Sequence, residues 1–348
     1  MSTALDSGRM RVRPLLSYTD DQGNIRQITT PEEWANRRTQ LRGIIEYYLG
    51  EAPPLEAKPP VFTVLEEKDQ PEYKQMLISY EVEPGEIVKA HLLIPPKEKR
   101  RCGAAVLCQH GTSTEAKDTQ LGAGAKRNRD WGCLLAKHGF IILAPDHVCA
   151  GERQPADIKP YDTSPFAARY PKWSATGKAI WDAQRALDVL CRLEEVDPQR
   201  LGTIGHSLGG YSSIFLAAFD ERVRAAVSSC GLTSWQDNPK KLEFARDRWY
   251  VHFPRLREPF LRNEIPFDMH EFAALIAPRP FLNISGMADK MYSPSNDNMP
   301  EIGYQLSQVW SLLGAGEGFA NFLTGTDHDV PDYVQALAVA WMVRWLCE

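Results

Sequence analysis

The chain has 348 residues, with 40 Lys and Arg against 45 Asp and Glu, which gives a net charge of −5. Apolar residues make up 43% and charged residues 24%, as in ordinary globular proteins. Acids and bases are interspersed, which excludes a basic nucleic-acid surface, and the longest apolar runs are too short to span a bilayer. Seven cysteines without paired spacing, and no visible signal peptide, predict a reduced, cytoplasmic protein, or a secreted one if a leader precedes this sequence.

The N-terminal 75 residues are predicted to form a helical extension followed by a linker. The segment Thr30-Pro31-Glu32-Glu33 has the features of a helix start: a threonine cap, a proline in the first helical position and a glutamate at the third. The proline-rich run at residues 52–60 indicates an extended connector. Between these two segments, apolar residues recur at helical spacing, namely Trp34, Leu41, Ile45 and Tyr48.

Residues 76–348 are predicted to form one catalytic domain. Strand-like segments at 76–82 and 87–94 flank the turn pair Pro84-Gly85, which predicts an antiparallel hairpin. Short apolar strands then alternate with helices, which predicts an α/β fold with a mainly parallel central sheet and helices on both faces. The predicted strands cover 104–108, 140–144, 201–204, 223–228, 280–285 and 319–323, and the predicted helices cover 130–138, 178–195, 211–219, 303–313 and 331–346.

The segment Gly205-His206-Ser207-Leu208-Gly209 lies between a predicted strand and a predicted helix. A G-x-S-x-G pattern in this position is typical of a nucleophile elbow, in which a strained turn exposes the serine above the sheet. Small residues are needed two positions before and after the serine, because the strand and the helix approach each other closely there. The sequence therefore predicts that Ser207 is a nucleophile.

A serine nucleophile needs a base and an orienting acid. Both are expected just after later strands, because functional groups collect at the carboxyl ends of parallel strands. Asp289 follows the fifth of the six predicted apolar strands and His328 follows the sixth, and the order Ser207, Asp289, His328 is typical of this architecture. Asp237, which follows the fourth strand, stays open as an alternative acid.

Two backbone amides are expected to stabilise the tetrahedral oxyanion of the reaction. The amide of Leu208 stands at the start of the elbow helix, and the amide of Thr112 belongs to the loop Gln109-His110-Gly111-Thr112 after the first apolar strand. The sequence has no H-E-x-x-H pattern, no cluster of Cys and His and no phosphate-binding loop. Neither a metal nor a cofactor is therefore predicted.

The connection at residues 231–272 is too long for a plain link that contains one helix, so it is predicted to form a partial lid. It is rich in aromatic residues, most of which are expected to pack the lid onto the body. Trp235, Trp249 and His252 are the residues of this segment predicted to contact the substrate.

Together these segments resemble the α/β-hydrolase superfamily, and more narrowly the dienelactone-hydrolase and acetyl-xylan-esterase-like branch of bacterial esterases. The similarity covers about residues 75–346 and is most specific from Arg185 to Gly210. The resemblance implies the α/β-hydrolase fold and a serine-esterase activity. Besides the elbow and the loop at Gln109, the matching motifs are Leu92-Leu93-Ile94-Pro95, Ala144-Pro145-Asp146, Gly151-Glu152-Arg153, Trp181-Asp182, Arg185-Ala186-Leu187-Asp188, Ala277-Pro278-Arg279-Pro280, Gly286-Met287-Ala288-Asp289 and Asp327-His328.

Two departures limit what the resemblance implies about the substrate. Leu208 follows the nucleophile, whereas glucuronoyl esterases place there an arginine that meets a uronate carboxylate, and this difference argues against a uronate ester. The elbow carries a serine and not a cysteine, which argues against dienelactone hydrolase activity itself.

The sequence therefore predicts a serine carboxylesterase or acetyl-esterase-like enzyme that acts on small, sugar or aryl esters. Two alternatives stay open: a peptidase or amidase similar to prolyl oligopeptidases, and a non-catalytic hydrolase-like binding module. The expected partner is a small-molecule ester, with neither nucleic acid nor a membrane, and the protein is expected to be a monomer or a homodimer.

Overall fold

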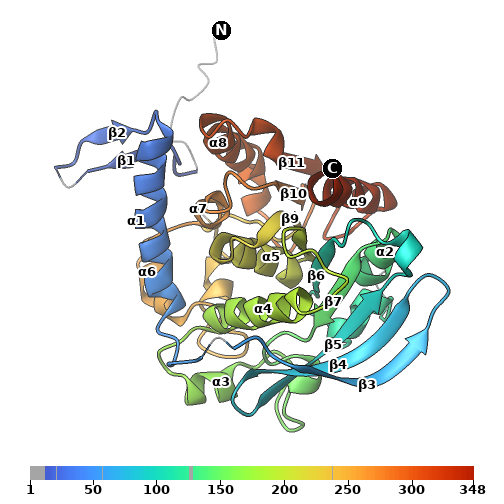
Figure 1. Ribbon diagram of the computed structural model, residues 1–348. Helices are drawn as coiled ribbons and strands as arrows, with labels where there is room; N and C mark the ends of the chain where they lie inside the picture. The colour runs from blue at the N-terminus through green and yellow to red at the C-terminus, as the bar shows by residue number, and fades with distance from the viewer. Residues whose placement is uncertain (1–11, 21, 57, 125–127, 237) are drawn as a thin grey trace.

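The computed structural model describes residues 12–20, 22–56, 58–124, 128–236 and 238–348. A nine-stranded sheet runs through its centre (Figure 1). In chain order its strands are β3 (Phe62–Asp69), β4 (Lys74–Glu83), β5 (Glu86–Ile94), β6 (Ala105–Gln109), β7 (Ile141–Pro145), β8 (Leu201–His206), β9 (Val223–Ser229), β10 (Phe281–Gly286) and β11 (Phe319–Thr324). Their spatial order is β11-β10-β9-β8-β6-β7-β5-β4-β3.

The sheet is parallel from β7 to β11, and β5, β4 and β3 pair antiparallel at one side. The hairpin of β4 and β5 and all six apolar strands were predicted from the sequence, to within two residues at most ends. The structure therefore confirms the α/β class and the mainly parallel sheet.

Helices cover both faces of the sheet (Figure 1). Because side chains alternate along a strand, β6 contributes to both layers: Val106 and Cys108 pack in the core that contains α2 and α9, and Ala105 and Leu107 pack in the core that contains α4 and α5. No helix of the described residues is long and apolar enough to cross a bilayer. The helices are α2 (Trp131–Lys137), α3 (Ser164–Arg169), α4 (Ala175–Cys191), α5 (Leu208–Phe219), α8 (Met299–Leu312) and α9 (Asp332–Cys347).

The N-terminal segment adds α1 (Pro31–Leu49) and the short strands β1 (Ser17–Thr19) and β2 (Ile25–Gln27). The predicted capping box is present: Glu33 N donates to Thr30 Oγ1 at 3.2 Å, and the Glu33 carboxylate accepts from the Thr30 amide. Strand β3 was not predicted, and it belongs to the central sheet. The division of the chain at residue 75 remains a prediction, although β3 precedes this boundary and pairs with β4 across it.

The insertion at residues 231–272 contains short helical turns at Lys241–Phe244 and Pro254–Leu256 and the helices α6 (Arg257–Leu261) and α7 (Met269–Ala274), of which α7 begins in it. Trp235 is fully buried, and its ring centroid lies 5.3 Å from those of Phe260 and Phe267. This aromatic core packs the insertion onto the body. The prediction that Trp235 contacts substrate is therefore wrong, because a side chain that fills the core cannot also face the cavity described below.

Candidate active site

The turn between β8 and α5 has the geometry of a nucleophile elbow. Ser207 has a φ of +59°, in the left-handed region that a non-glycine residue adopts only under strain. The strand and helix meet closely around it. A Cβ on Gly205 would lie 2.4 Å from Gly209 C, and a Cβ on Gly209 would lie 1.9 Å from Gln109 O. Both positions therefore require glycine.

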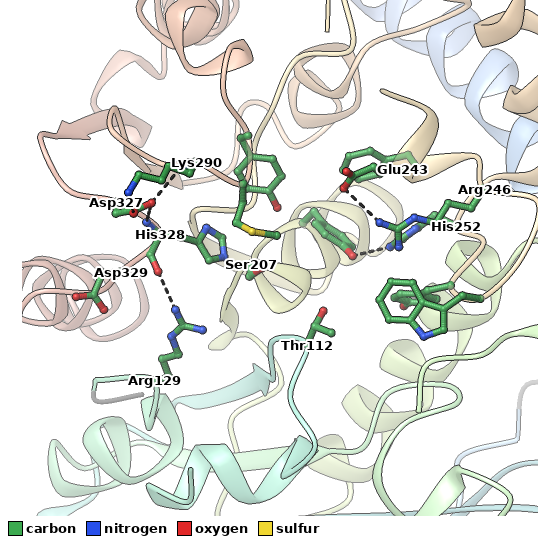
Figure 2. Close-up of a pocket in the computed structure, with 16 residues that line it drawn as sticks. Thr112, Arg129, Ser207, Glu243, Arg246, His252, Lys290, Asp327, His328 and Asp329 are labelled. Atoms are coloured by element: carbon green, nitrogen blue, oxygen red, sulfur yellow. Dashed lines mark hydrogen bonds and ion pairs between the residues drawn. The ribbon is translucent and has the colours of Figure 1, made fainter. Parts of the chain in front are cut away.

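Asp289, which is buried, and His328, which is partly buried, form a closely spaced pair at the carboxyl ends of β10 and β11. His328 Nδ1 lies 2.6 Å from Asp289 Oδ2, and Asp289 is 1% exposed. The other carboxylate oxygen, Oδ1, accepts from the Met291 amide at 2.8 Å, so the carboxylate has a fixed orientation. Figure 2 shows the His328 ring turned toward Ser207.

The backbone of His328 is held from two sides. Its amide donates to Asp327 Oδ1 at 2.8 Å, and its carbonyl accepts from Arg129 Nη2 at 2.8 Å. The ring of His206, from the elbow, packs against the ring of His328 with centroids 4.7 Å apart. These contacts restrict both the loop and the imidazole.

Tyr292 lies beside the nucleophile in the same cavity and was not singled out in the sequence. Burial raises the pKa of its phenol, and the nearby Ser207 side chain offsets a small part of that rise. Its ring also lies 5.7 Å from that of His328. No motif marks this tyrosine; its position three residues after Asp289 is the only signal in the sequence that could have suggested it.

The loop after β6 is held rigidly beside Ser207. His147 N donates to His110 Nε2 at 3.0 Å, so His110 is a neutral imidazole whose Nδ1 donates to Gly111 O at 2.8 Å. Burial lowers the pKa of His110, which favours this neutral form. The Tyr161 hydroxyl accepts from Ser113 N at 2.8 Å and donates to Ser113 O at 2.7 Å. These contacts fix the backbone on both sides of Thr112.

Ser207, His328 and Thr112 face one cavity of about 800 Å³. The insertion forms its opposite wall, where Arg246 Nη2 donates to Glu243 Oε2 at 3.2 Å and the Arg246 guanidinium lies 4.7 Å from the centroid of the Trp249 ring (Figure 2). The charges of the cavity lining are balanced. The three acids are Glu243, Asp327 and Asp329, and the three bases are Arg129, Arg246 and Lys290.

His252 lines the same wall in a buried position. Its Nε2 lies 2.5 Å from the hydroxyl of Tyr211, a residue of α5. Burial, with a smaller contribution from the nearby Arg246 charge, lowers the pKa of His252 to about 3, so this imidazole is neutral across the physiological range. Its polar contact with Tyr211 joins the insertion to the elbow helix.

The structure thus brings Ser207, Asp289, His328 and Thr112 together, with Leu208 buried as the first residue of α5. Trp249 and His252 line the cavity, so their contact with substrate stays a prediction, and Trp235 does not line it. The alternative acid, Asp237, lies outside the described residues. Besides Tyr292, the sequence did not single out Arg129, Arg246 or Cys230; the last of these places its thiol sulfur within 4.8 Å of Asp289 and His328 ligand atoms.

Comparisons with known proteins agree with this architecture. The family described as "Glucuronyl esterase, fungi" matches residues 163–314, which is less than half of the chain. The "Putative hydrolase YtaP" of Bacillus subtilis is 26% identical over 291 residues, which cover 81% of this chain and 91% of that protein. A 4-O-methyl-glucuronoyl methylesterase of Phanerochaete carnosa is 24% identical over 216 residues, which cover 53% of this chain and 51% of that enzyme.

Among solved structures, a glucuronoyl esterase from Solibacter usitatus superposes with a TM-score of 0.70 at 21% identity, covering 94% of this chain and 96% of that one. At this identity the likeness establishes the fold. The protein has the α/β-hydrolase fold and is similar in sequence to the hydrolase and the methylesterase named above. Taken together, the site and these similarities indicate a carboxylic ester hydrolase.

Proposed function

We propose that the protein is a serine esterase that hydrolyses carboxylic esters of carbohydrates through an acyl-enzyme. The observation that carries the proposal is the Asp289–His328 pair, with its 2.6 Å contact, facing the same cavity as a serine on a strained elbow. A serine on an elbow, a histidine and a carboxylate that orients the histidine are the groups that nucleophilic catalysis needs.

In the proposed reaction, Ser207 Oγ attacks the ester carbonyl while His328 Nε2 takes its proton. The short contact with Asp289 keeps the Nδ1 proton in place and stabilises the imidazolium. The amides of Leu208 and Thr112 hold the oxyanion of the tetrahedral intermediate. His328 then protonates the leaving alcohol, which departs and leaves the acyl group on Ser207. In the second half-reaction water attacks this acyl group in the same way and releases the acid.

The wall opposite Ser207 supports a sugar in the substrate. Trp249 offers an aromatic surface, and the Arg246–Glu243 pair offers donors and acceptors for hydroxyl groups at one place. The comparisons add two relatives whose names specify glucuronoyl esters. Glucuronoyl esterases are expected to have an arginine after the nucleophile, whereas this chain has Leu208. The two esters to compare are therefore an ester of a uronic acid and an acetate ester of a sugar.

The test is a set of four substrates: methyl glucuronate, an acetylated xylo-oligosaccharide, p-nitrophenyl acetate and a chromogenic prolyl amide. We expect turnover of at least one sugar ester with a higher kcat/KM than p-nitrophenyl acetate. Ser207→Ala should lower kcat by about 10⁴-fold or more, and Ser307→Ala, in α8, should match the wild type. If the protein hydrolysed the prolyl amide faster than the esters, it would be an amidase and not an esterase. Absence of fluorophosphonate labelling at Ser207 would favour a binding module.

A further inference from the structure

Three side chains that commonly bind metals gather at the ends of three neighbouring strands. Cys230 follows β9, Asp289 follows β10 and His328 follows β11. One ligand atom from each lies within 4.8 Å of the other two. Cys230 and Asp289 are buried, while His328 also lines the cavity, so an ion can approach the group from the substrate side.

The position of Cys230 is held by its backbone. Its φ of +46° lies in the left-handed region, which disfavours a residue with a Cβ by about 1–2 kcal/mol. The Cys230 amide donates to Ile284 O at 2.7 Å, which anchors this conformation to β10. A strained backbone that brings a thiol within 4.8 Å of a carboxylate and an imidazole is a reason to look for a ligand there.

We propose that Cys230, Asp289 and His328 form a site for one thiophilic divalent cation, Zn²⁺, and that its binding inhibits the enzyme. Zinc in proteins prefers cysteine sulfur, histidine nitrogen and carboxylate oxygen, at 2.0–2.3 Å and in a tetrahedral arrangement. Three protein ligands leave the fourth position for water. A thiolate and a carboxylate also neutralise the two positive charges of the ion, which makes a buried position acceptable.

Inhibition follows from the ligands themselves and rests on the proposed function. If a metal binds His328 Nδ1, it displaces the proton shared with Asp289; if it binds Nε2, it occupies the lone pair that would take the Ser207 proton. Coordination by Cys230 releases the thiol proton to solvent. The sequence did not predict this site because its three ligands are distant along the chain and form no motif.

The inhibition experiment measures ester hydrolysis against Zn²⁺ in a buffer without chelators or thiols. We expect EDTA to restore the activity of the wild type. In Cys230→Ala the Zn²⁺ concentration for half-inhibition, relative to that variant's own metal-free activity, should rise at least ~10-fold, since one ligand of three is lost. Cys102→Ala removes an exposed thiol and should behave as the wild type. Equal inhibition of Cys230→Ala and the wild type would overturn the proposal.

The binding experiment does not depend on activity. Ser207→Ala protein is titrated with Cd²⁺, whose thiolate charge-transfer absorption reports a Cys–metal bond. We expect one equivalent of Cd²⁺ to produce this absorption in Ser207→Ala. The absorption should be absent in Ser207→Ala/Cys230→Ala, whose circular dichroism should be unchanged. An unchanged titration in the double variant overturns the site. If the wild type hydrolyses no ester, a Cys230-dependent Cd²⁺ signal still supports the metal site, while the proposed function alone fails.

Discussion

The hydroxyl of Tyr292 lies beside the side chain of Ser207, which offsets a small part of the rise that burial produces in the pKa of the phenol. Tyr292 and Asp289 belong to the same loop after β10, so one segment contacts both the proposed nucleophile and, through Asp289, the proposed base. A hydroxyl partner restricts the rotamers of Ser207 before substrate arrives. Tyr292 is in this view a positioning residue for the nucleophile.

Tyr292→Phe keeps the ring and removes only the hydroxyl. A neutral hydrogen bond contributes about 0.5–1.5 kcal/mol, so kcat should fall about 2- to 13-fold with KM nearly unchanged. Steady-state kinetics on p-nitrophenyl acetate measure the split. Tyr304→Phe, an exposed tyrosine on α8, is the matched control. A change confined to KM, or to thermal stability, would assign Tyr292 a structural role only.

Two aspartates lie close to His328, and their geometry separates their roles. Asp289 contacts the ring at Nδ1, whereas Asp327 accepts from the backbone amide at 2.8 Å and is exposed. Asp289→Asn should lower kcat by about 10³- to 10⁴-fold, because the amide supports the wrong imidazole tautomer. Asp327→Asn should cost less than about tenfold. Comparable losses in the two variants would contradict the assignment of the acid.

The fold could be predicted largely because its strands are strongly patterned. Strands such as β6 and β8 are buried along their whole length, and a short apolar run between helices is the signature of a parallel sheet. Strand β3 lacks that signature: it lies at the edge of the sheet, and seven of its eight residues are exposed. With neither face buried, its sequence carries no alternation to detect.

The site could be predicted only as far as chain order determines it. Ser207, Asp289 and His328 follow strands in the order the architecture requires, and so each could be found from its place. Tyr292, Arg246 and Cys230 reach the site through loop conformation, including the left-handed backbone of Cys230, which no local pattern specifies. Trp235 was mistaken for a cavity residue for the same reason, since an aromatic residue in a lid fits core and cavity equally well.

Arg246 gives a test of sugar recognition. Its guanidinium lies between Glu243 and the Trp249 ring on the cavity wall. Arg246→Gln removes the charge and the stacking surface, so KM for the preferred sugar ester should rise about tenfold, equivalent to one charge-assisted hydrogen bond. KM for p-nitrophenyl acetate should change less than about twofold.

The control for Arg246 is Arg248→Gln, since Arg248 is exposed and belongs to the same segment. It should leave both KM values unchanged. An equal rise in KM for the sugar ester and for p-nitrophenyl acetate would contradict a role of Arg246 in binding the sugar.

Two glycine substitutions test the close packing of the elbow. Gly209→Ala places a Cβ 1.9 Å from Gln109 O, so the strand and helix must separate, and we expect loss of activity together with a lower melting temperature. Gly43→Ala, in α1, meets no described atom within 4 Å and should stabilise the protein by up to about 1 kcal/mol, the difference in helix propensity. Thermal unfolding and ester hydrolysis are measured on both variants. If Gly209→Ala kept its activity and its melting temperature, the elbow would tolerate a side chain and the prediction would be wrong.

The buried His252 predicts how stability depends on pH. Its pKa is about 3 in the folded protein, chiefly because of burial, and about 6.5 in an unfolded chain. Between these values the unfolded state binds one more proton than the folded state. The contribution of His252 to the free energy of unfolding is therefore fully present above pH 6.5 and decreases as the pH falls. The contribution of this residue is about 1.4 kcal/mol per pH unit.

His252→Gln, which can still bond to Tyr211, should reduce the slope of unfolding free energy against pH by this amount in urea titrations between pH 6 and 4.5. Parallel slopes for the variant and the wild type would mean that His252 becomes charged inside the folded protein.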